Sequence, residues 1–366
     1  MIIVILISLC LVSLTILGLI LYKTSVKDVK PQSDVIVKID INNFQIQKDS
    51  LYLAAIAYTN SLKIKTLLTT DCAVMIDTYK KIQSSINNKW EIVWGPAIGR
   101  IGTAILAVYD NMMYIVKDKI NQNNYKIVIR GTNPIALTSW IYQNPPFKLI
   151  NWDSNVDHGQ ISEGTYNAFL GKTINDGILF IKPCNGVPGY GLVLTDYLKK
   201  IPSNSNISIV GHSLGGLLST TLHLYLENKK ALWSKSNIYL TSISFGGPTA
   251  GNNLFADYSN KVLGNNFIRV VNTMDIATYA WSNLLSVKSL YKYMIDSIPI
   301  NYFIDKLYNS VYTKFYTQLN NKRVFSFKAG QKTLLVEFFS QAIYQHLQAY
   351  LNYYSINEMD ILIFLK

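Results

Sequence analysis

The chain has 366 residues, 49% of them hydrophobic and 15% charged, which is enough to bury a sizeable core in one large or two modest domains. Its net charge is +12, and most of the excess comes from lysine. The sequence contains no basic block interleaved with aromatic residues, so we expect no nucleic-acid partner. The positive charge either reflects overall composition or attracts the protein to anionic lipid surfaces.

Residues 1–22 are apolar and uncharged, with the sequence MIIVILISLCLVSLTILGLILY. A helix of this length spans roughly 30 Å, the thickness of the hydrocarbon core of a bilayer. A cleaved signal peptide is the alternative, but it would need a basic start and a small-residue cleavage site. We therefore predict a retained single-pass membrane anchor. Lys23, Lys27 and Lys30 follow it, and positive flanks favour the cytosolic side for the rest of the chain, with a secretory lumen as the alternative.

After the anchor, we expect a polar linker over 23–45 and one α/β domain over 46–366. In this domain apolar β-branched runs alternate with helix-like stretches, which is typical of a mostly parallel sheet flanked by helices. The expected helices lie at 50–62, 187–200 and 214–230. The expected strands lie at 125–131, 207–210, 238–245 and 267–271, with a further hairpin within 104–116 that turns at Asp110-Asn111.

Two segments give weaker signals. Residues 284–333 are rich in Tyr and Lys and contain Pro299, so helices and loops are expected there without an indicated role. The end of the chain, 359–366, is apolar but too short to cross a membrane. Outside the anchor the only cysteines are Cys72 and Cys184, which do not make a disulfide framework; a single bridge between them is possible but has no support in the sequence.

The stretch Gly211-His212-Ser213-Leu214-Gly215 lies between an expected strand and an expected helix. It fits the pattern G-x-S-x-G, in which a strand turns sharply into a helix and exposes the central serine. The flanking glycines let the two backbones approach each other, and the start of the helix presents N–H groups to developing negative charge. Ser213 is therefore the candidate nucleophile.

A serine hydroxyl needs a general base, and on this type of fold an acid and then a histidine follow the serine in the chain. His158 precedes Ser213, and His212 adjoins it. His223 lies within the following helix. His346 is therefore the candidate base.

The acid must lie between Ser213 and His346. Six carboxylates do so: Glu227, Asp257, Asp275, Asp296, Asp305 and Glu337. Asp275 follows the expected strand 267–271, and the carboxyl ends of parallel strands meet at the edge of the sheet where the serine turn lies. Asp275 is therefore the candidate acid.

The edge of the sheet at the carboxyl ends of the parallel strands also offers residues for an oxyanion hole. The backbone N–H of Leu214 follows the nucleophile directly, and Thr132 follows the expected strand 125–131 with both an N–H and a hydroxyl. These five residues can cleave a carboxylic ester through an acyl-enzyme. Such chemistry requires neither a metal nor a cofactor.

Four stretches in this order resemble the class 3 lipases, the fungal-lipase-like branch of the α/β-hydrolases: IVIRGT at 127–132, IVGHSLGG at 209–216, SFGGPTAGN at 244–252 and RVVNTMD at 269–275. The resemblance implies an α/β-hydrolase fold, a triad of Ser213, Asp275 and His346, and an oxyanion hole of Thr132 and Leu214. It also implies a lid within 133–153 and a lipid ester as substrate.

The function expected on this basis is hydrolysis of acylglycerol esters at a membrane. A phospholipase A1 or an acyltransferase would use the same triad, and the sequence does not separate them. An inactive hydrolase scaffold that binds lipid or a partner is the alternative from another class. The sequence does not indicate an oligomeric state.

Overall fold

The computed structural model describes residues 41–61, 70–102, 107–132, 148–171, 177–234, 238–290, 298–320, 322–326, 338 and 341–357. The predicted anchor 1–22, the predicted linker up to residue 40 and most of the predicted lid lie outside these ranges. Within them, none of the helices combines the length and the apolar composition that crossing a bilayer requires.

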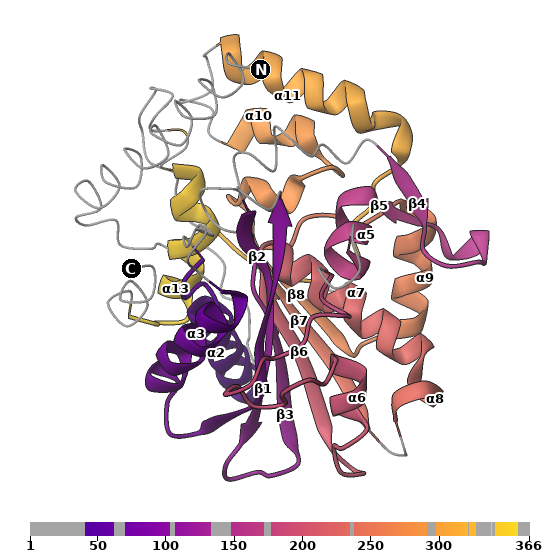
Figure 1. The fold of residues 1–366 in the computed structure, drawn as a ribbon. Helices are drawn as coiled ribbons and strands as arrows, with labels where there is room; N and C mark the ends of the chain where they lie inside the picture. Colours follow the sequence, from indigo (N-terminus) through magenta and orange to yellow (C-terminus); the bar gives the residue numbers. More distant parts are fainter. Residues whose placement is uncertain are drawn as a thin grey trace.

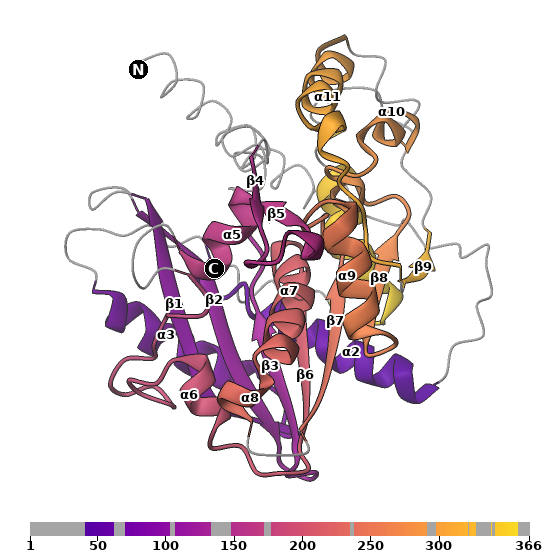
Figure 2. The ribbon, with the colours of Figure 1, turned by 90° about the vertical axis from the view of Figure 1, so that its right-hand side faces the viewer.

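A seven-stranded sheet forms the centre of the domain, in the order β1-β2-β3-β6-β7-β8-β9 (Figures 1 and 2). Its strands are β1 (Trp90–Gly102), β2 (Ala107–Asp118), β3 (Asn124–Ile129), β6 (Asn206–His212), β7 (Tyr239–Phe245), β8 (Phe267–Asn272) and β9 (Lys322–Phe325). The first three pair antiparallel, and every pairing from β3 to β9 is parallel. The expected mostly parallel sheet is confirmed.

Helices cover both faces of the sheet and enclose two apolar cores (Figure 1). One face carries α2 (Ile41–Ile56), α3 (Asp71–Ser85), the π-helix η5 (Tyr344–Gln348) and α13 (Ala349–Tyr353). The other carries α5 (Glu163–Leu170), α6 (Leu194–Leu198), α7 (Leu214–Asn228), α8 (Lys230–Trp233) and α9 (Asn253–Leu263). Two short strands, β4 (Leu149–Asn151) and β5 (Gln160–Ser162), flank the short helix η1 (Val156–His158).

A small helical cap lies beyond the carboxyl ends of the parallel strands (Figures 1 and 2). It consists of η2 (Ile276–Tyr279), η3 (Leu284–Ser286), α10 (Val287–Leu290), α11 (Ile298–Val311) and η4 (Tyr312–Lys314). The cap has an apolar core of its own, which includes Trp281, Ile304 and Leu307. Helices were expected in this part of the chain, but β9 was not, because its four residues are too few to show a periodic pattern.

The hairpin turn expected at Asp110-Asn111 is wrong, because β2 runs straight through these residues. The register of β1 and β2 changes between the pairs Ile98–Met112 and Arg100–Tyr109, which sets two residues of β2 against one of β1. This is a β-bulge, and the polar pair marks the bulge instead of a chain reversal. Strand β1 itself was not predicted.

Three further expectations need correction. Helix α2 begins at Ile41, so residues 41–45 are helical and do not belong to a linker. In the predicted helix 187–200, only Leu194–Leu198 forms an α-helix, because glycines with positive φ shape the residues before it. Cys72 and Cys184 form a disulfide between α3 and the segment ahead of α6, with their Cα atoms 5.5 Å apart.

A cavity of about 360 Å³ opens at the amino ends of the parallel strands, beneath α2. Lys126 on β3 lines it and donates to Ser50 Oγ at 2.8 Å. Burial lowers the pKa of Lys126 to about 8. The cavity lies at the end of the sheet opposite Ser213, so it is separate from the candidate active site.

Candidate active site

Ser213 occupies the sharp turn between β6 and α7. Its backbone has φ 61° and ψ −128°, a conformation that a residue with a side chain rarely adopts. Its N–H donates to the carbonyl of Phe245 on β7 at 2.9 Å, which ties the turn to the neighbouring strand. Strained backbone of this kind persists only where the surrounding structure holds it, and it concentrates at functional sites.

The two glycines of the turn are sterically required. A Cβ on Gly211 would lie 2.2 Å from the carbonyl oxygen of Gly215, and a Cβ on Gly215 would lie 2.2 Å from the carbonyl oxygen of Ile129. Neither backbone atom can move without displacing a strand or a helix. The close approach expected from the sequence is therefore present at both positions.

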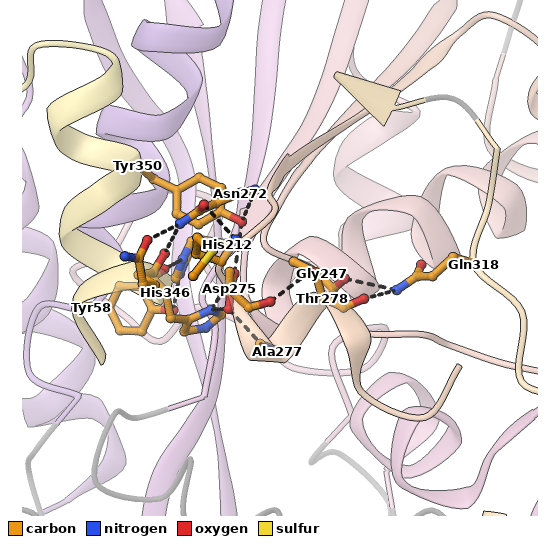
Figure 3. Close-up of polar contacts among 12 residues, drawn as sticks. Tyr58, His212, Gly247, Asn272, Asp275, Ala277, Thr278, Gln318, His346 and Tyr350 are labelled. Carbon is orange, nitrogen blue, oxygen red and sulfur yellow. Dashed lines mark hydrogen bonds and ion pairs between the residues drawn. The ribbon is translucent and has the colours of Figure 1, made fainter. Parts of the chain in front are cut away.

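Asp275 and His346 form a buried hydrogen-bonded pair (Figure 3). Both carboxylate oxygens of Asp275 lie 2.9 Å from Nδ1 of His346. A carboxylate only accepts, so Nδ1 carries the proton and Nε2 is left as the basic nitrogen. This Nε2 is buried and has no hydrogen-bond partner among the described residues.

Two other groups fix the carboxylate of Asp275. The N–H of Ala277 donates to Oδ1 at 2.9 Å, where Asp275 caps the short helix η2. The hydroxyl of Tyr350 donates to Oδ2 at 2.9 Å (Figure 3). Burial first, and then the Asp275 charge, raises the pKa of Tyr350 well above its ordinary value, so this hydroxyl remains a donor.

The segment that carries His346 is a π-helix, Tyr344–Gln348, a rare form that occurs often at functional sites. Asn272, at the end of β8, holds it: its Nδ2 donates to the carbonyl and to the side-chain oxygen of Gln345, each at 2.8 Å (Figure 3). The N–H of Asn272 donates in turn to the hydroxyl of Tyr350 at 3.1 Å. The strand that leads to Asp275 therefore also positions His346.

His212, directly before Ser213, links the serine turn to the same π-helix. Its Nε2 donates to the main-chain carbonyl of His346 at 2.5 Å, and its Nδ1 lies 2.9 Å from the hydroxyl of Tyr58, beyond the end of α2. Burial first, and then the neighbouring His346 ring, lowers the pKa of His212 well below its ordinary value. The neutral ring therefore accepts from Tyr58 and donates to His346.

The expected oxyanion residues lie at the same turn. Thr132 directly follows Gly131, and a Cβ on Gly131 would lie 3.0 Å from Cβ of Ser213. The hydroxyl of Thr132 is buried and has no hydrogen-bond partner among the described residues. Leu214 begins helix α7, so its N–H is one of those that an α-helix leaves unpaired.

The comparisons with known proteins concern the sequence family and the fold. Residues 126–283 match the sequence profile of the family described as "Lipase (class 3)". The crystal structure of M37 lipase superposes with a TM-score of 0.73 and 26% sequence identity, covering 86% of this chain and 96% of that one. Residues 126–283 of this chain are therefore similar to the class 3 lipases, and its fold is similar to that of a solved lipase.

It is accordingly a carboxylic ester hydrolase of the triacylglycerol lipase type. Lip2 lipase from Yarrowia lipolytica is a more distant structural match, with 15% identity, a TM-score of 0.47 and coverage of 81% of this chain and 82% of that one. No curated protein sequence is significantly similar to this chain.

Two other histidines of the chain have structural partners. His223 is buried in α7, with Nδ1 2.9 Å from Ser242 Oγ. His158 binds Asp153 at 2.8 Å and stacks on Tyr258. Neither hydrogen-bonds to Asp275, whereas His346 does.

Among the other acids considered, Glu227 pairs with Lys230 and Asp305 pairs with Lys288. Asp257 lies on α9, while Asp296 and Glu337 lie outside the described residues.

The sequence did not indicate the polar residues around the pair. Tyr58 falls within the helix expected at 50–62, and His212 adjoins the candidate nucleophile. No motif of the sequence assigns a role to Asn272 or Tyr350. The sequence offers only a weak signal for Tyr350, which follows His346 by one helical turn, and none for the others.

Proposed function

We propose that the protein is a serine lipase that hydrolyses acylglycerol esters through Ser213, His346 and Asp275. The observation that carries the proposal is the buried Asp275–His346 pair, whose Nε2 has no hydrogen-bond partner among the described residues, together with the strained turn at Ser213. The rings of His346 and His212 are 4.6 Å apart, and His212 adjoins Ser213 in the chain. A base of this kind activates a serine that is otherwise a weak nucleophile.

The reaction proceeds in two halves. Ser213 Oγ attacks the ester carbonyl carbon while Nε2 of His346 takes the hydroxyl proton. The C–O bond to the leaving alcohol then breaks, and Nε2 returns that proton to the alkoxide. Water attacks the acyl-enzyme with the same histidine as base, and the fatty acid and free Ser213 result.

The remaining groups act on charge and orientation. Asp275 holds Nδ1–H of His346 and stabilises the imidazolium that forms when Nε2 is protonated. The N–H of Leu214 and the N–H and hydroxyl of Thr132 are the proposed donors to the oxyanion. The unpaired hydroxyl of Thr132 supports this role, because it needs no rearrangement before it donates.

Labelling with a fluorophosphonate tests the proposal without requiring knowledge of the substrate. The full-length protein in detergent should react once, and Ser213→Ala and His346→Ala should not react. Ser84→Ala, an exposed serine on α3, is the matched control and should label like the wild type. If folded wild-type protein stays unlabelled in the presence of lipid, the result would contradict the lipase function and favour an inactive hydrolase scaffold.

The substrate is tested separately on the same preparation. Trioctanoylglycerol, a phosphatidylcholine and a soluble p-nitrophenyl ester should be compared at equal enzyme concentration. Faster release of fatty acid from the acylglycerol supports a lipase. Preferential release from the sn-1 position of the phospholipid would instead indicate a phospholipase A1.

A further inference from the structure

Three aromatic side chains project from the cap into solvent. Tyr302 is 68% exposed, Tyr312 57% and Phe315 69%. They belong to α11 and the residues that follow it, and α11 is the outermost helix at the carboxyl end of the sheet (Figures 1 and 2). Exposed large apolar side chains that lie close together along the chain mark a candidate interaction site.

The opposite face of α11 is already used for packing. Ile300, Ile304, Leu307 and Val311 are buried in the core of the cap. Tyr302 and Lys306 are four residues apart and share the outer face of the helix. The exposed aromatic side chains therefore do not contribute to the apolar core of the cap.

Phe315 has a strained backbone conformation. Its φ is 52° and its ψ 38°, a left-handed conformation that is unusual for a bulky residue. The next residue, Tyr316, is buried and bridges to Asn252. The turn thus buries one aromatic and directs the other outward, where it gains no burial in the isolated protein.

The charge on this surface is positive. Asp305 is the one acid between residues 298 and 316, and Lys288 pairs with it at 2.5 Å. Lys306 and Lys314 have no ion-pair partner among the described residues. Tyrosines combined with lysines are typical of surfaces that lie in the headgroup region of a bilayer.

The cap is held firmly over the candidate active site. Ile276, directly after Asp275, packs against its core. Gln318, just past the cap, donates to the carbonyls of Thr278 at 3.2 Å and Gly247 at 3.4 Å (Figure 3). A lipid surface bound by the cap would therefore lie at the same end of the molecule as Ser213.

We propose that Tyr302, Lys306, Tyr312, Lys314 and Phe315, the cap surface, dock the enzyme onto a lipid bilayer that carries anionic headgroups. This inference rests on the proposed lipase function. The aromatics enter the headgroup region, and the two lysines are attracted to its negative potential. The docked cap brings the site to its substrate.

Cosedimentation with vesicles tests the proposal. The full-length protein is first inserted into phosphatidylcholine nanodiscs, so that the predicted anchor, residues 1–22, is already in a bilayer and does not insert into the vesicles. Binding is then measured to vesicles of phosphatidylcholine with and without phosphatidylglycerol. The triple variant Tyr302→Ser/Tyr312→Ser/Phe315→Ser should bind about tenfold more weakly. Lys306→Gln/Lys314→Gln should abolish the preference for phosphatidylglycerol.

The matched control is Ile120→Ser/Leu232→Ser. These side chains are 88% and 69% exposed and lie at the opposite end of the sheet. This variant should bind vesicles like the wild type. Unchanged binding of the triple variant, or equal loss in the control, would overturn the proposal.

Hydrolysis of dissolved p-nitrophenyl butyrate separates this proposal from the lipase function. The triple variant should keep the wild-type rate within about twofold, since soluble ester needs no docking. A wild type that binds vesicles but hydrolyses nothing would contradict the lipase function alone. A triple variant that hydrolyses soluble ester and still binds vesicles normally would contradict the docking surface alone.

Discussion

The imidazole of His212 donates from Nε2 to the main-chain carbonyl of His346, 134 positions away in the chain. One residue of the serine turn thereby holds the backbone of the candidate base. Tyr58 fixes the tautomer of His212 from the other side, at 2.9 Å from Nδ1. The nucleophile and its base are therefore positioned relative to each other even without a bound substrate.

Replacing His212 by Phe should lower kcat for a soluble ester by about 10- to 100-fold. The ring still fills the space, but it cannot donate to His346, and small displacements of a catalytic group cost that much. KM should change little, because His212 does not contact the substrate in the proposed mechanism. Steady-state kinetics on p-nitrophenyl butyrate measures both quantities.

His212→Gln is the informative partner of that variant. Its amide places a donor close to the position of Nε2 and should recover much of the lost kcat. If the Gln and Phe variants are equally slow, the hydrogen bond to His346 is not the reason for the loss. Circular dichroism melting curves confirm that both variants are folded.

Tyr350→Phe should lower the free energy of unfolding by about 1–3 kcal/mol, because it leaves the buried N–H of Asn272 without its acceptor. It also removes one donor from Asp275, which keeps its bonds to His346 and Ala277. Urea denaturation measures the stability, and kcat should fall by less than about tenfold.

Tyr354→Phe is the control for Tyr350→Phe. The hydroxyl of Tyr354 is also buried near the end of α13, but it donates to Gln47 at 2.6 Å and not to Asp275. Its loss should reduce stability without changing kcat. Equal kcat values for both variants would show that Tyr350 has no influence on the carboxylate.

His223 should make the protein less stable in acid. Burial, and to a smaller extent Lys230, lowers its pKa to about 3. Between pH 6.5 and 3 the unfolded chain binds a proton at this site and the folded chain does not, so stability decreases as the pH falls. His223→Gln should therefore lose about 2 kcal/mol less than the wild type between pH 7.5 and pH 5.

Urea titrations at the two pH values test this. Ser242→Ala removes the hydrogen-bond partner of His223 but leaves the imidazole buried. It should lower stability at both pH values while keeping the wild-type dependence on pH. A His223→Gln protein with the wild-type pH dependence would assign the acid sensitivity to other groups.

The disulfide between Cys72 and Cys184 closes a long loop, with a sequence separation of 112 residues. Cys72→Ser should lower the free energy of unfolding by about 2–5 kcal/mol. Structural disulfides persist in oxidising compartments, whereas the lysines after the predicted anchor favour the cytosolic side. The two indications point to opposite sides of a membrane.

Alkylation of the thiols in intact expressing cells decides between these sides. We expect Cys72 and Cys184 to be blocked to maleimide until a reductant is added, which would place the domain in an oxidising compartment. Immediate labelling of both would show reduced thiols and favour the cytosolic side. The Cys72→Ser/Cys184→Ser double variant controls for labelling elsewhere in the chain.

Much of the parallel sheet follows from local sequence. Runs such as 207–210 and 238–245 are apolar and β-branched because both faces of the strand are buried, and this signal needs no knowledge of the neighbours. Local sequence gave a wrong prediction at Asp110-Asn111, where the polar pair is typical of a turn but forms a β-bulge. Whether such a pair turns or bulges depends on the partner strand.

Local sequence predicted the serine turn, and it singled out Asp275, just after β8, and His346 as the candidate acid and base. Each depends on a residue type at a fixed distance from a strand or helix, and such distances are set by backbone geometry. The contacts by which Tyr58, His212, Asn272 and Tyr350 hold these groups could not be predicted in this way. Hydrogen bonds between distant segments depend on the path of the whole chain, which no local pattern encodes.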